Sequence, residues 1–184
     1  MVDSDIVLDA CVLIPMALCD VLLRAAAANL YRPRWSEDIL VEVGRNLVEN
    51  GLTDDRGAQH RISAMRQAFA DASVEIDRNL LGGIDVDPKD RHVVAAAIAG
   101  NAQTIVTLNL RHFPEHALSP YGIEAQSPDG FLVGLCDFAP SAMIDVVRRQ
   151  AADLRNPPVS LGQLLDSLSR HAPSFADRMR SHPP

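Results

Sequence analysis

The chain contains 184 residues, of which 47% are hydrophobic and 22% are charged, and its formal net charge at pH 7 is −7. These values are typical of a folded globular protein of about one domain, and they exclude a disordered chain. The acidic balance argues against a protein that binds nucleic acid over its whole surface, because such proteins are usually basic.

The first half of the chain predicts strands and helices in alternation. The short apolar run at residues 6–8 is typical of a buried strand in a parallel sheet. Apolar residues at helical spacing predict a helix over about residues 11–29 that covers this sheet. A serine followed by two acids predicts the start of a second helix over about residues 36–50. A weaker helical pattern follows at about residues 53–70, and a short strand is expected at residues 74–76.

The second half continues this alternation. Asp87 and Pro88 predict a helix N-terminus, and Gly100 or Asn101 closes that helix. Residues 104–108 form the pattern of a second buried strand. The remaining expected elements are an edge strand at residues 123–125 and helices at residues 127–135, 140–154, 160–170 and 173–181.

Strands that alternate with helices through short connections predict a three-layer α/β/α domain with a central parallel sheet. We expect this domain to occupy residues 1–138 and a small helical extension to occupy residues 139–184. The chain shows no internal repeats and no low-complexity segments.

The cysteines and the N-terminal segment indicate a cytoplasmic protein. Cys11, Cys19 and Cys136 are odd in number and form no C-x-x-C pair, so neither a disulfide framework nor a thiolate zinc site is expected. The first residues are acidic where a secretion signal would be basic. Asp20 and Arg24 interrupt the longest apolar stretch, so no membrane segment is expected.

Polar residues follow both buried strands, Asp9 after the first and Asn109 after the second. Ligands of an open parallel sheet bind at the carboxyl ends of its strands, so these positions are the first candidates for a site. Asp90 shares one helical face with two buried positions, which aims its carboxylate at the same end of the sheet. Glu42 lies at the border of the apolar stripe of its helix.

Each of these acids also has a purely structural interpretation. Asp9 is placed to cap the helix that follows it, and Asp90 suits the first turn of its helix, where the helix dipole favours an acid. Glu42 at the border of an apolar stripe is compatible with a solvated side chain.

Three carboxylates at one end of a sheet would repel one another and raise each other's proton affinity. A hard divalent cation relieves this repulsion. Magnesium prefers oxygen ligands, takes one or two protein carboxylates directly, and keeps water that serves as a nucleophile. The charge distribution agrees, because residues 1–139 hold 20 acidic and 11 basic side chains, whereas residues 140–184 hold 4 and 6. RNA binding by such a site would depend on the divalent cation.

The order and spacing of these motifs resemble a PIN-domain ribonuclease, specifically the VapC-type toxins of bacterial toxin–antitoxin pairs. The resemblance covers about residues 4–135 and rests on Ile-Val-Leu-Asp9-Ala-Cys, Ile-Leu-Val-Glu42-Val, Asp87-Pro-Lys-Asp90-Arg-His and Thr104-Ile-Val-Thr-Leu-Asn109. The tail, with Pro157-Pro158 and Ala172-Pro173, is similar to a helical C-terminal extension that one subgroup of these toxins carries.

The resemblance implies a PIN-like fold and a Mg²⁺- or Mn²⁺-dependent endoribonuclease, a hydrolase of RNA phosphodiester bonds. Asp9, Glu42 and Asp90 match the acidic positions that hold the metal and position the attacking water. Asn109 matches a further catalytic position where this subgroup has Asn, and Thr107 matches a threonine that orients an acidic neighbour. The resemblance also implies a small antitoxin partner and a homodimer.

The sequence departs from the family pattern at His112, where related chains carry an acid. We expect His112 and Arg111 to contact the RNA, although a surface histidine without a role also fits position 112. A non-enzymatic alternative follows, in which the chain is a PIN-like module for RNA binding or dimerisation that has lost catalysis. A phosphatase of the haloacid dehalogenase type is not supported, because its second Asp would fall at Cys11.

Overall fold

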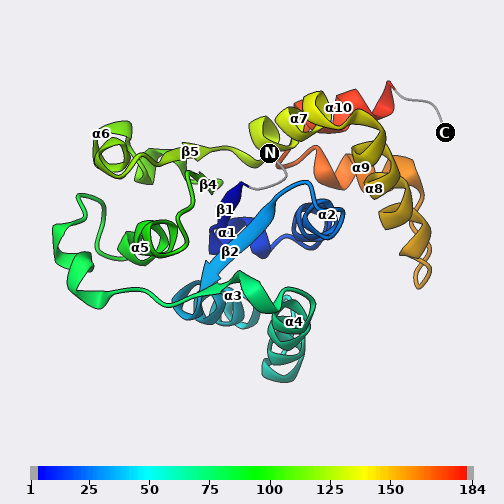
Figure 1. The fold of residues 1–184 in the computed structure, drawn as a ribbon. Helices are drawn as coiled ribbons and strands as arrows, with labels where there is room; N and C mark the ends of the chain where they lie inside the picture. Colours follow the sequence, from blue (N-terminus) through cyan, green and yellow to red (C-terminus); the bar gives the residue numbers. More distant parts are fainter. Residues whose placement is uncertain (1–3, 182–184) are drawn as a thin grey trace.

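The computed structural model describes residues 4–181, and within them five parallel strands form one sheet. The strand order is β3-β2-β1-β4-β5, with bounds Asp5–Leu8 (β1), Arg32–Ser36 (β2), Ser73–Val74 (β3), Thr104–Val106 (β4) and Glu124–Gln126 (β5). Helices lie on both faces of this sheet (Figure 1). The predicted three-layer α/β/α architecture with a central parallel sheet is therefore confirmed.

Strand β1 occupies the centre of the sheet and pairs with β2 on one side and with β4 on the other. The chain proceeds outward from β1 to β2 and β3, and then crosses back to β4 on the opposite side of β1. Such a reversal of strand order opens a crevice at the carboxyl ends of the strands, where ligands of α/β proteins bind. Leu8 and Val106 pair at these ends, so the residues that follow them line the same crevice.

Helices form the outer layers. Their bounds are α1 Ala10–Leu13, α2 Met16–Ala27, α3 Glu37–Glu49, α4 Asp55–Ala68, α5 Arg91–Ala99, α6 Glu115–Leu118, α7 Pro128–Phe138, α8 Pro140–Asp153, α9 Leu161–Leu168 and α10 Pro173–Arg180. Short 3-10 helices lie at η1 Ala70–Ala72, η2 Arg78–Gly83, η3 Leu110–His112 and η4 Ser119–Tyr121. Helix α5 packs against β1, β2 and β4, and α2 lies across the sheet from it (Figure 1).

The prediction of one helix over residues 11–29 is wrong, because α1 and α2 are separate helices. Pro15 has no backbone N–H and lies in extended conformation, so a helix cannot continue through it. Arg61 donates hydrogen bonds to the carbonyl oxygens of Leu13 (2.6 Å) and Ile14 (3.3 Å), which a continuous helix would have satisfied internally. The single turn of α1 therefore follows directly on the end of β1.

Strand β2 is an element that the sequence patterns did not predict. Its two arginines pair across the strands, since Arg32 and Arg34 both donate hydrogen bonds to the Asp5 carboxylate of β1, at 2.8 and 2.7 Å. Trp35 is completely buried, and its ring meets that of Phe69 edge-on at 5.9 Å between centroids. The strand thus contributes Trp35 to the core, although it also contains two arginines.

Helix α5 begins later than Asp87 and Pro88 predicted. The Asp87 carboxylate accepts a hydrogen bond from the Lys89 amide (3.1 Å), and the Asp87 carbonyl accepts one from the Asp90 amide (2.8 Å). These bonds close a turn before the helix, which places Asp90 at the N-cap position of α5 without a side-chain cap bond. The predicted closure is confirmed, since Asn101 adopts a left-handed conformation with φ 50°.

The other predicted elements are present with small shifts of their ends. Ser36 caps α3 and Ser127 caps α7, each by accepting a hydrogen bond from a backbone amide of the first turn. The strand predicted to reach Leu108 ends at Val106, and β3 begins one residue before the predicted Val74. β5 lies at the edge of the sheet, as expected.

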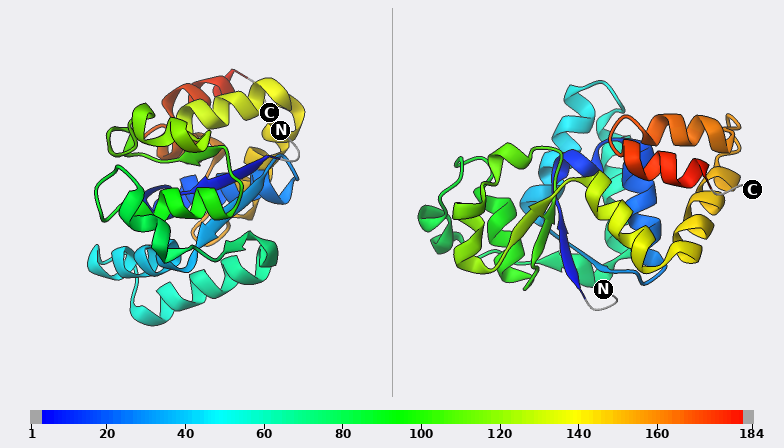
Figure 2. Two further views of the ribbon diagram at one scale, coloured as in Figure 1. Left: turned by 60° about the vertical axis from the view of Figure 1, so that its left-hand side comes forward. Right: turned by 90° about the horizontal axis from the view of Figure 1, so that it is seen from above.

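The C-terminal helices α8, α9 and α10 lie on the same side of the sheet as α2 (Figure 2). Asp129, predicted as a first-turn acid of α7, also accepts a hydrogen bond from the Phe175 amide in the first turn of α10 (2.9 Å). Helix α7 packs against both α8 and α10. The division of the chain at residues 138 and 139 stays a prediction.

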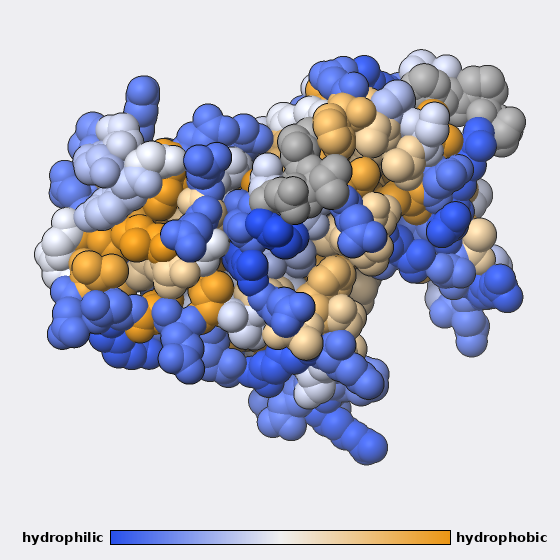
Figure 3. Space-filling view, in the orientation of Figure 1, coloured by the Kyte–Doolittle hydropathy of each residue, from blue (hydrophilic) through white to orange (hydrophobic). Residues whose placement is uncertain are grey.

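Apolar side chains gather over η2, α5 and α6 at one end of the face shown in Figure 3. Leu80 of η2 and Leu110 of η3 are among the exposed large apolar residues. No helix within residues 4–181 is long and apolar enough to cross a membrane.

Candidate active site

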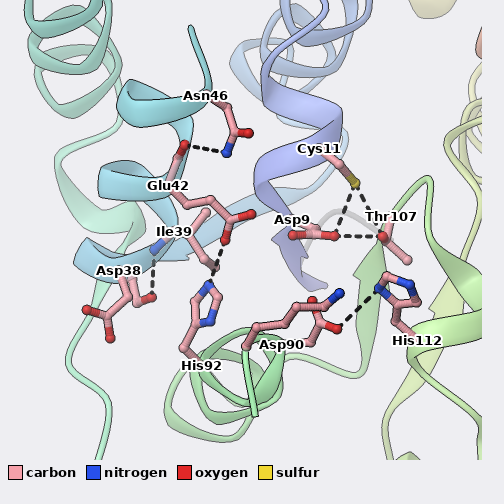
Figure 4. A network of polar contacts seen from close by, with 12 residues as sticks. Asp9, Cys11, Asp38, Ile39, Glu42, Asn46, Asp90, His92, Thr107 and His112 are labelled. Carbon is pink, nitrogen blue, oxygen red and sulfur yellow. Dashed lines mark hydrogen bonds and ion pairs between the residues drawn. The ribbon is translucent and has the colours of Figure 1, made fainter. Parts of the chain in front are cut away.

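The candidate site lies where the strand order reverses, beyond the ends of β1 and β4. Asp9 follows β1 directly and Thr107 follows β4. Glu42 comes from α3 and Asp90 from the turn that precedes α5. The four side chains thus reach one region from four parts of the chain (Figure 4).

Asp9 is buried, with 7% of its surface exposed. Its Oδ2 accepts a hydrogen bond from the Thr107 hydroxyl (2.7 Å) and another from the Cys11 thiol (3.1 Å). Asp9 occupies the N-cap position of α1, yet its side chain makes no cap bond. The structural interpretation of Asp9 as a helix cap is therefore wrong, and both donors bind the carboxylate at the same oxygen.

The loop after β4 holds these two donors in place. The Thr107 hydroxyl accepts a hydrogen bond from the Asn109 amide (3.0 Å), and the Cys11 sulfur accepts one from the Leu108 amide (3.2 Å). Burial and the Asp9 charge raise the pKa of the Cys11 thiol to about 12, although its contacts with the Thr107 hydroxyl and the Leu108 amide oppose this rise. The thiol therefore keeps its proton at neutral pH and donates it to Asp9.

Glu42 faces a histidine that was not predicted to belong to the site. The Nε2 atom of His92 lies 3.3 Å from Glu42 Oε2 and joins α5 to α3 (Figure 4). Burial lowers the pKa of His92, but its contact with the Glu42 carboxylate and a hydrogen bond with the backbone of Lys89 outweigh burial and raise it. The sequence signal for His92 is its place two residues after Asp90.

Asp90 is paired with His112. Asp90 Oδ2 lies 3.2 Å from His112 Nδ1, and the two side chains are 18% and 22% exposed. Burial raises the pKa of Asp90, the nearby Asp9 carboxylate adds to this rise, and His112 opposes it. The Arg111 guanidinium donates a hydrogen bond to His112 Nε2 (3.3 Å). Asp9 and Asp90 are thus close enough to repel each other.

Asn109 and Arg111 lie beside this network. The Asn109 amide supports Thr107, but within residues 4–181 the Asn109 side chain makes no hydrogen bond. Arg111 is exposed in η3 and donates a hydrogen bond to His112. Within residues 4–181, neither side chain has a hydrogen bond or ion pair with the three carboxylates.

The donor set suits a hard divalent cation. Figure 4 shows one oxygen each of Asp9, Glu42 and Asp90 turned toward the space between them. No three His, Cys, Asp or Glu side chains of the described chain lie close enough to hold one ion together. Mg²⁺ needs only one or two direct carboxylates and fills its other positions with water, so it fits this arrangement. Burial is the main cause of the raised pKa of Asp90, and a cation would relieve the smaller contribution that the Asp9 charge makes to it.

Comparisons with known proteins agree with this geometry. The PIN domain family model matches residues 1–111, and the model of a VapC50 C-terminal domain matches residues 128–181. The chain is 40% identical over 102 residues to the "Putative ribonuclease VapC50" of Mycobacterium tuberculosis (strain ATCC 25618 / H37Rv). That match covers 55% of this chain and spans 60% of the length of the relative.

No solved structure matches the chain. The PIN domain match covers more than half of the chain and contains Asp9, Glu42 and Asp90. The second match begins at the first residue of α7, ahead of the predicted start of the extension. On this evidence the chain belongs to the PIN domain family.

Proposed function

We propose that the protein is a metal-dependent endoribonuclease and the toxin component of a toxin–antitoxin pair. One observation carries this proposal, namely that Asp9, Glu42 and Asp90 converge where the strand order reverses, each with one oxygen held by the protein. The family and the name of the mycobacterial relative support ribonuclease chemistry.

The proposed cation is Mg²⁺ or Mn²⁺, held by Asp9 and Asp90 with Glu42 beside them. When bound, it supplies a water of lowered pKa and neutralises charge on the phosphodiester. Glu42 accepts a hydrogen bond from the attacking water and orients it. Thr107 keeps Asp9 in one orientation through its 2.7 Å hydrogen bond. Asn109 offers a neutral oxygen at the rim of the site, and the exposed Arg111 contacts a phosphate of the RNA.

The remaining parts of the proposal concern the whole molecule. We propose residues 1–138 as the nuclease domain and residues 139–184 as a helical extension. The proposed partners are RNA, a small antitoxin and a second copy of the chain, and the proposed location is the cytoplasm. The similarity of the C-terminal residues to the VapC50 C-terminal domain supports the toxin assignment.

The test is cleavage of structured RNAs by the purified protein in Mg²⁺ or Mn²⁺, with and without EDTA. Metal-dependent cleavage is expected, and D9N and D90N should lower its rate about 10- to 100-fold or more, because each loses a carboxylate charge at the cation. Glu49→Gln is the matched control, since Glu49 lies exposed at the end of α3, which also carries Glu42.

Two outcomes contradict the proposal. Cleavage that persists in EDTA excludes the cation. Intact RNA with the wild type and with both variants, together with RNA binding by all three, favours the alternative of a catalytically inactive RNA-binding module. The inactive-module alternative is tested because Asp90 is paired with His112, the residue that departs from the family's acidic pattern.

A further inference from the structure

Two histidines contact the candidate carboxylates, and neither was assigned a role in holding them. His92 Nε2 lies 3.3 Å from Glu42 Oε2, and His112 Nδ1 lies 3.2 Å from Asp90 Oδ2. The pairs come from separate elements, since His92 lies in α5 and His112 in η3. Two of the three carboxylates thus meet an imidazole, while Asp9 meets a hydroxyl and a thiol.

Burial makes each pair mutually dependent. His92 Nε2, His112 Nδ1 and Asp90 Oδ2 are inaccessible to water, and within the described chain none has a hydrogen-bond partner, so each nitrogen meets its carboxylate only at ion-pair distance. A buried polar atom without a partner is costly, so each nitrogen depends on the carboxylate that it faces. The imidazoles therefore fix which oxygen of Glu42 and of Asp90 points into the protein.

The opposite oxygens remain free. For residues 4–181, no hydrogen bond reaches Asp9 Oδ1, Glu42 Oε1 or Asp90 Oδ1. Figure 4 shows these free oxygens turned toward one another. The same division appears three times, with one oxygen facing a protein side chain and the other turned toward the shared space.

Arg111 orients one of the histidines. Its Nε–H donates to His112 Nε2, so that nitrogen is an acceptor and the ring proton resides on Nδ1, facing Asp90. Contacts thus run from Arg111 through His112 to Asp90, the first a hydrogen bond and the second an ion pair. Both ring nitrogens of His112 are thereby engaged within the protein.

We propose that His92 and His112 are positioning residues, each of which holds one oxygen of a carboxylate so that the other faces the cation of the site. This inference rests on the proposed metal-dependent function. Ordered partners of metal ligands typically change metal affinity 10- to 100-fold when they are removed. The two histidines act only through Glu42 and Asp90.

The positions of the donating nitrogens provide a sharp test. The amide nitrogen of Asn stands close to Nδ1 of a histidine, whereas that of Gln reaches the position of Nε2. H112N and H92Q therefore keep a donor opposite the carboxylate, and H112Q and H92N misplace it. The probe is Mn²⁺ alone, titrated into the full chain without RNA and followed by calorimetry and by the electron paramagnetic resonance of free Mn²⁺. Circular dichroism establishes that each variant is folded.

H112A and H92A are expected to raise the Mn²⁺ dissociation constant about 10-fold or more. H112N and H92Q should stay within about 3-fold of the wild type, while H112Q and H92N should resemble the alanine variants. His60→Ala is the matched control, because His60 is exposed on α4.

Three results would overturn the inference. The alanine variants could bind Mn²⁺ as the wild type does, which removes the positioning role and leaves the proposed nuclease standing. Matched and mismatched variants could be equally impaired, which assigns the effect to packing between α3, α5 and η3. A wild type that binds no Mn²⁺ contradicts the proposed cation itself, and the inference fails with it.

Discussion

At the scale of single residues, Asp9 uses its two carboxylate oxygens for different purposes. Oδ2 receives both recorded donors, Thr107 at 2.7 Å and Cys11 at 3.1 Å. The Thr107 hydroxyl can donate only one hydrogen bond, and it donates this bond to Asp9. The hydroxyl also accepts a hydrogen bond from the Asn109 amide, which polarises its O–H toward Asp9. The backbone after β4 therefore controls the orientation of a side chain that follows β1.

Thr107→Val should weaken the nuclease while preserving the fold. Valine keeps the shape of threonine but cannot donate to Asp9, so the carboxylate is free to rotate. We expect initial rates of RNA cleavage in Mn²⁺ to fall about 10- to 100-fold, and Thr107→Ser, which keeps the hydroxyl, to retain most activity. Thr104→Val at the start of β4 is the control. Equal rates for the two valine variants would contradict the role given to Thr107.

A residue of the candidate site could be predicted from the sequence where its position relative to its own strand or helix indicates that it belongs to the site. Asp9 follows an apolar run, and Asp90 precedes a helix, so both are visible in the sequence. His92 was missed because it contacts Glu42, which lies far away along the chain. Cys11 was missed because the Leu108 amide that holds its sulfur against Asp9 is also distant in sequence. Periodicity does not reveal which distant side chain a buried nitrogen or sulfur meets.

At the scale of elements, helices and strands could likewise be predicted only where the sequence signals are local. Helices α3, α4 and α7 were predictable because caps and apolar stripes are local signals. β2 was not, since its arginines become compatible with a central strand only through Asp5 on β1. Pro15 is a local signal for the break between α1 and α2. The prediction of a single helix followed the apolar spacing on both sides of Pro15 instead.

Asp5→Asn should destabilise the protein more at neutral pH than in acid. Burial raises the pKa of Asp5, but hydrogen bonds and charge from Arg32 and Arg34 outweigh it and hold the pKa below its ordinary value of 3.8. A lowered pKa stabilises the fold above that ordinary value, and this contribution is lost as the pH falls through the folded-state pKa.

Urea unfolding at pH 7 and near pH 3 measures this difference. We expect Asp5→Asn to lower the free energy of unfolding by roughly 1 kcal/mol at pH 7. The gap to the wild type should narrow at the lower pH. A gap that is the same at both pH values would show that the Asp5 charge contributes nothing to the pairing of β1 and β2.

At the scale of the whole molecule, the C-terminal helices are tied to the α/β layers by contacts of several kinds. Buried Gln150 of α8 donates a hydrogen bond to the Ala17 carbonyl of α2 (3.0 Å), and Arg24 pairs with Asp153 at 2.8 Å. Asp129 links α7 to α10. Helix α7, at the end of the proposed nuclease domain, also packs against α8 and α10 of the proposed extension.

The Asp129 contact gives the last prediction. Asp129 Oδ1 accepts from the Phe175 amide near the N-terminus of α10, where an acid satisfies an unpaired amide and complements the helix dipole. Asp129→Ala should lower the free energy of unfolding by about 1 kcal/mol and speed hydrogen exchange at the start of α10, while exchange in α3 and α5 stays unchanged.

Ser174→Ala, at an exposed position beside Phe175, is the control. RNA cleavage should be unaffected, because Asp129 contacts none of the site residues. Unchanged hydrogen exchange at Phe175 would contradict the role given to the Asp129 contact. Equal acceleration of exchange in α5 would show that α10 opens only together with the α/β layers.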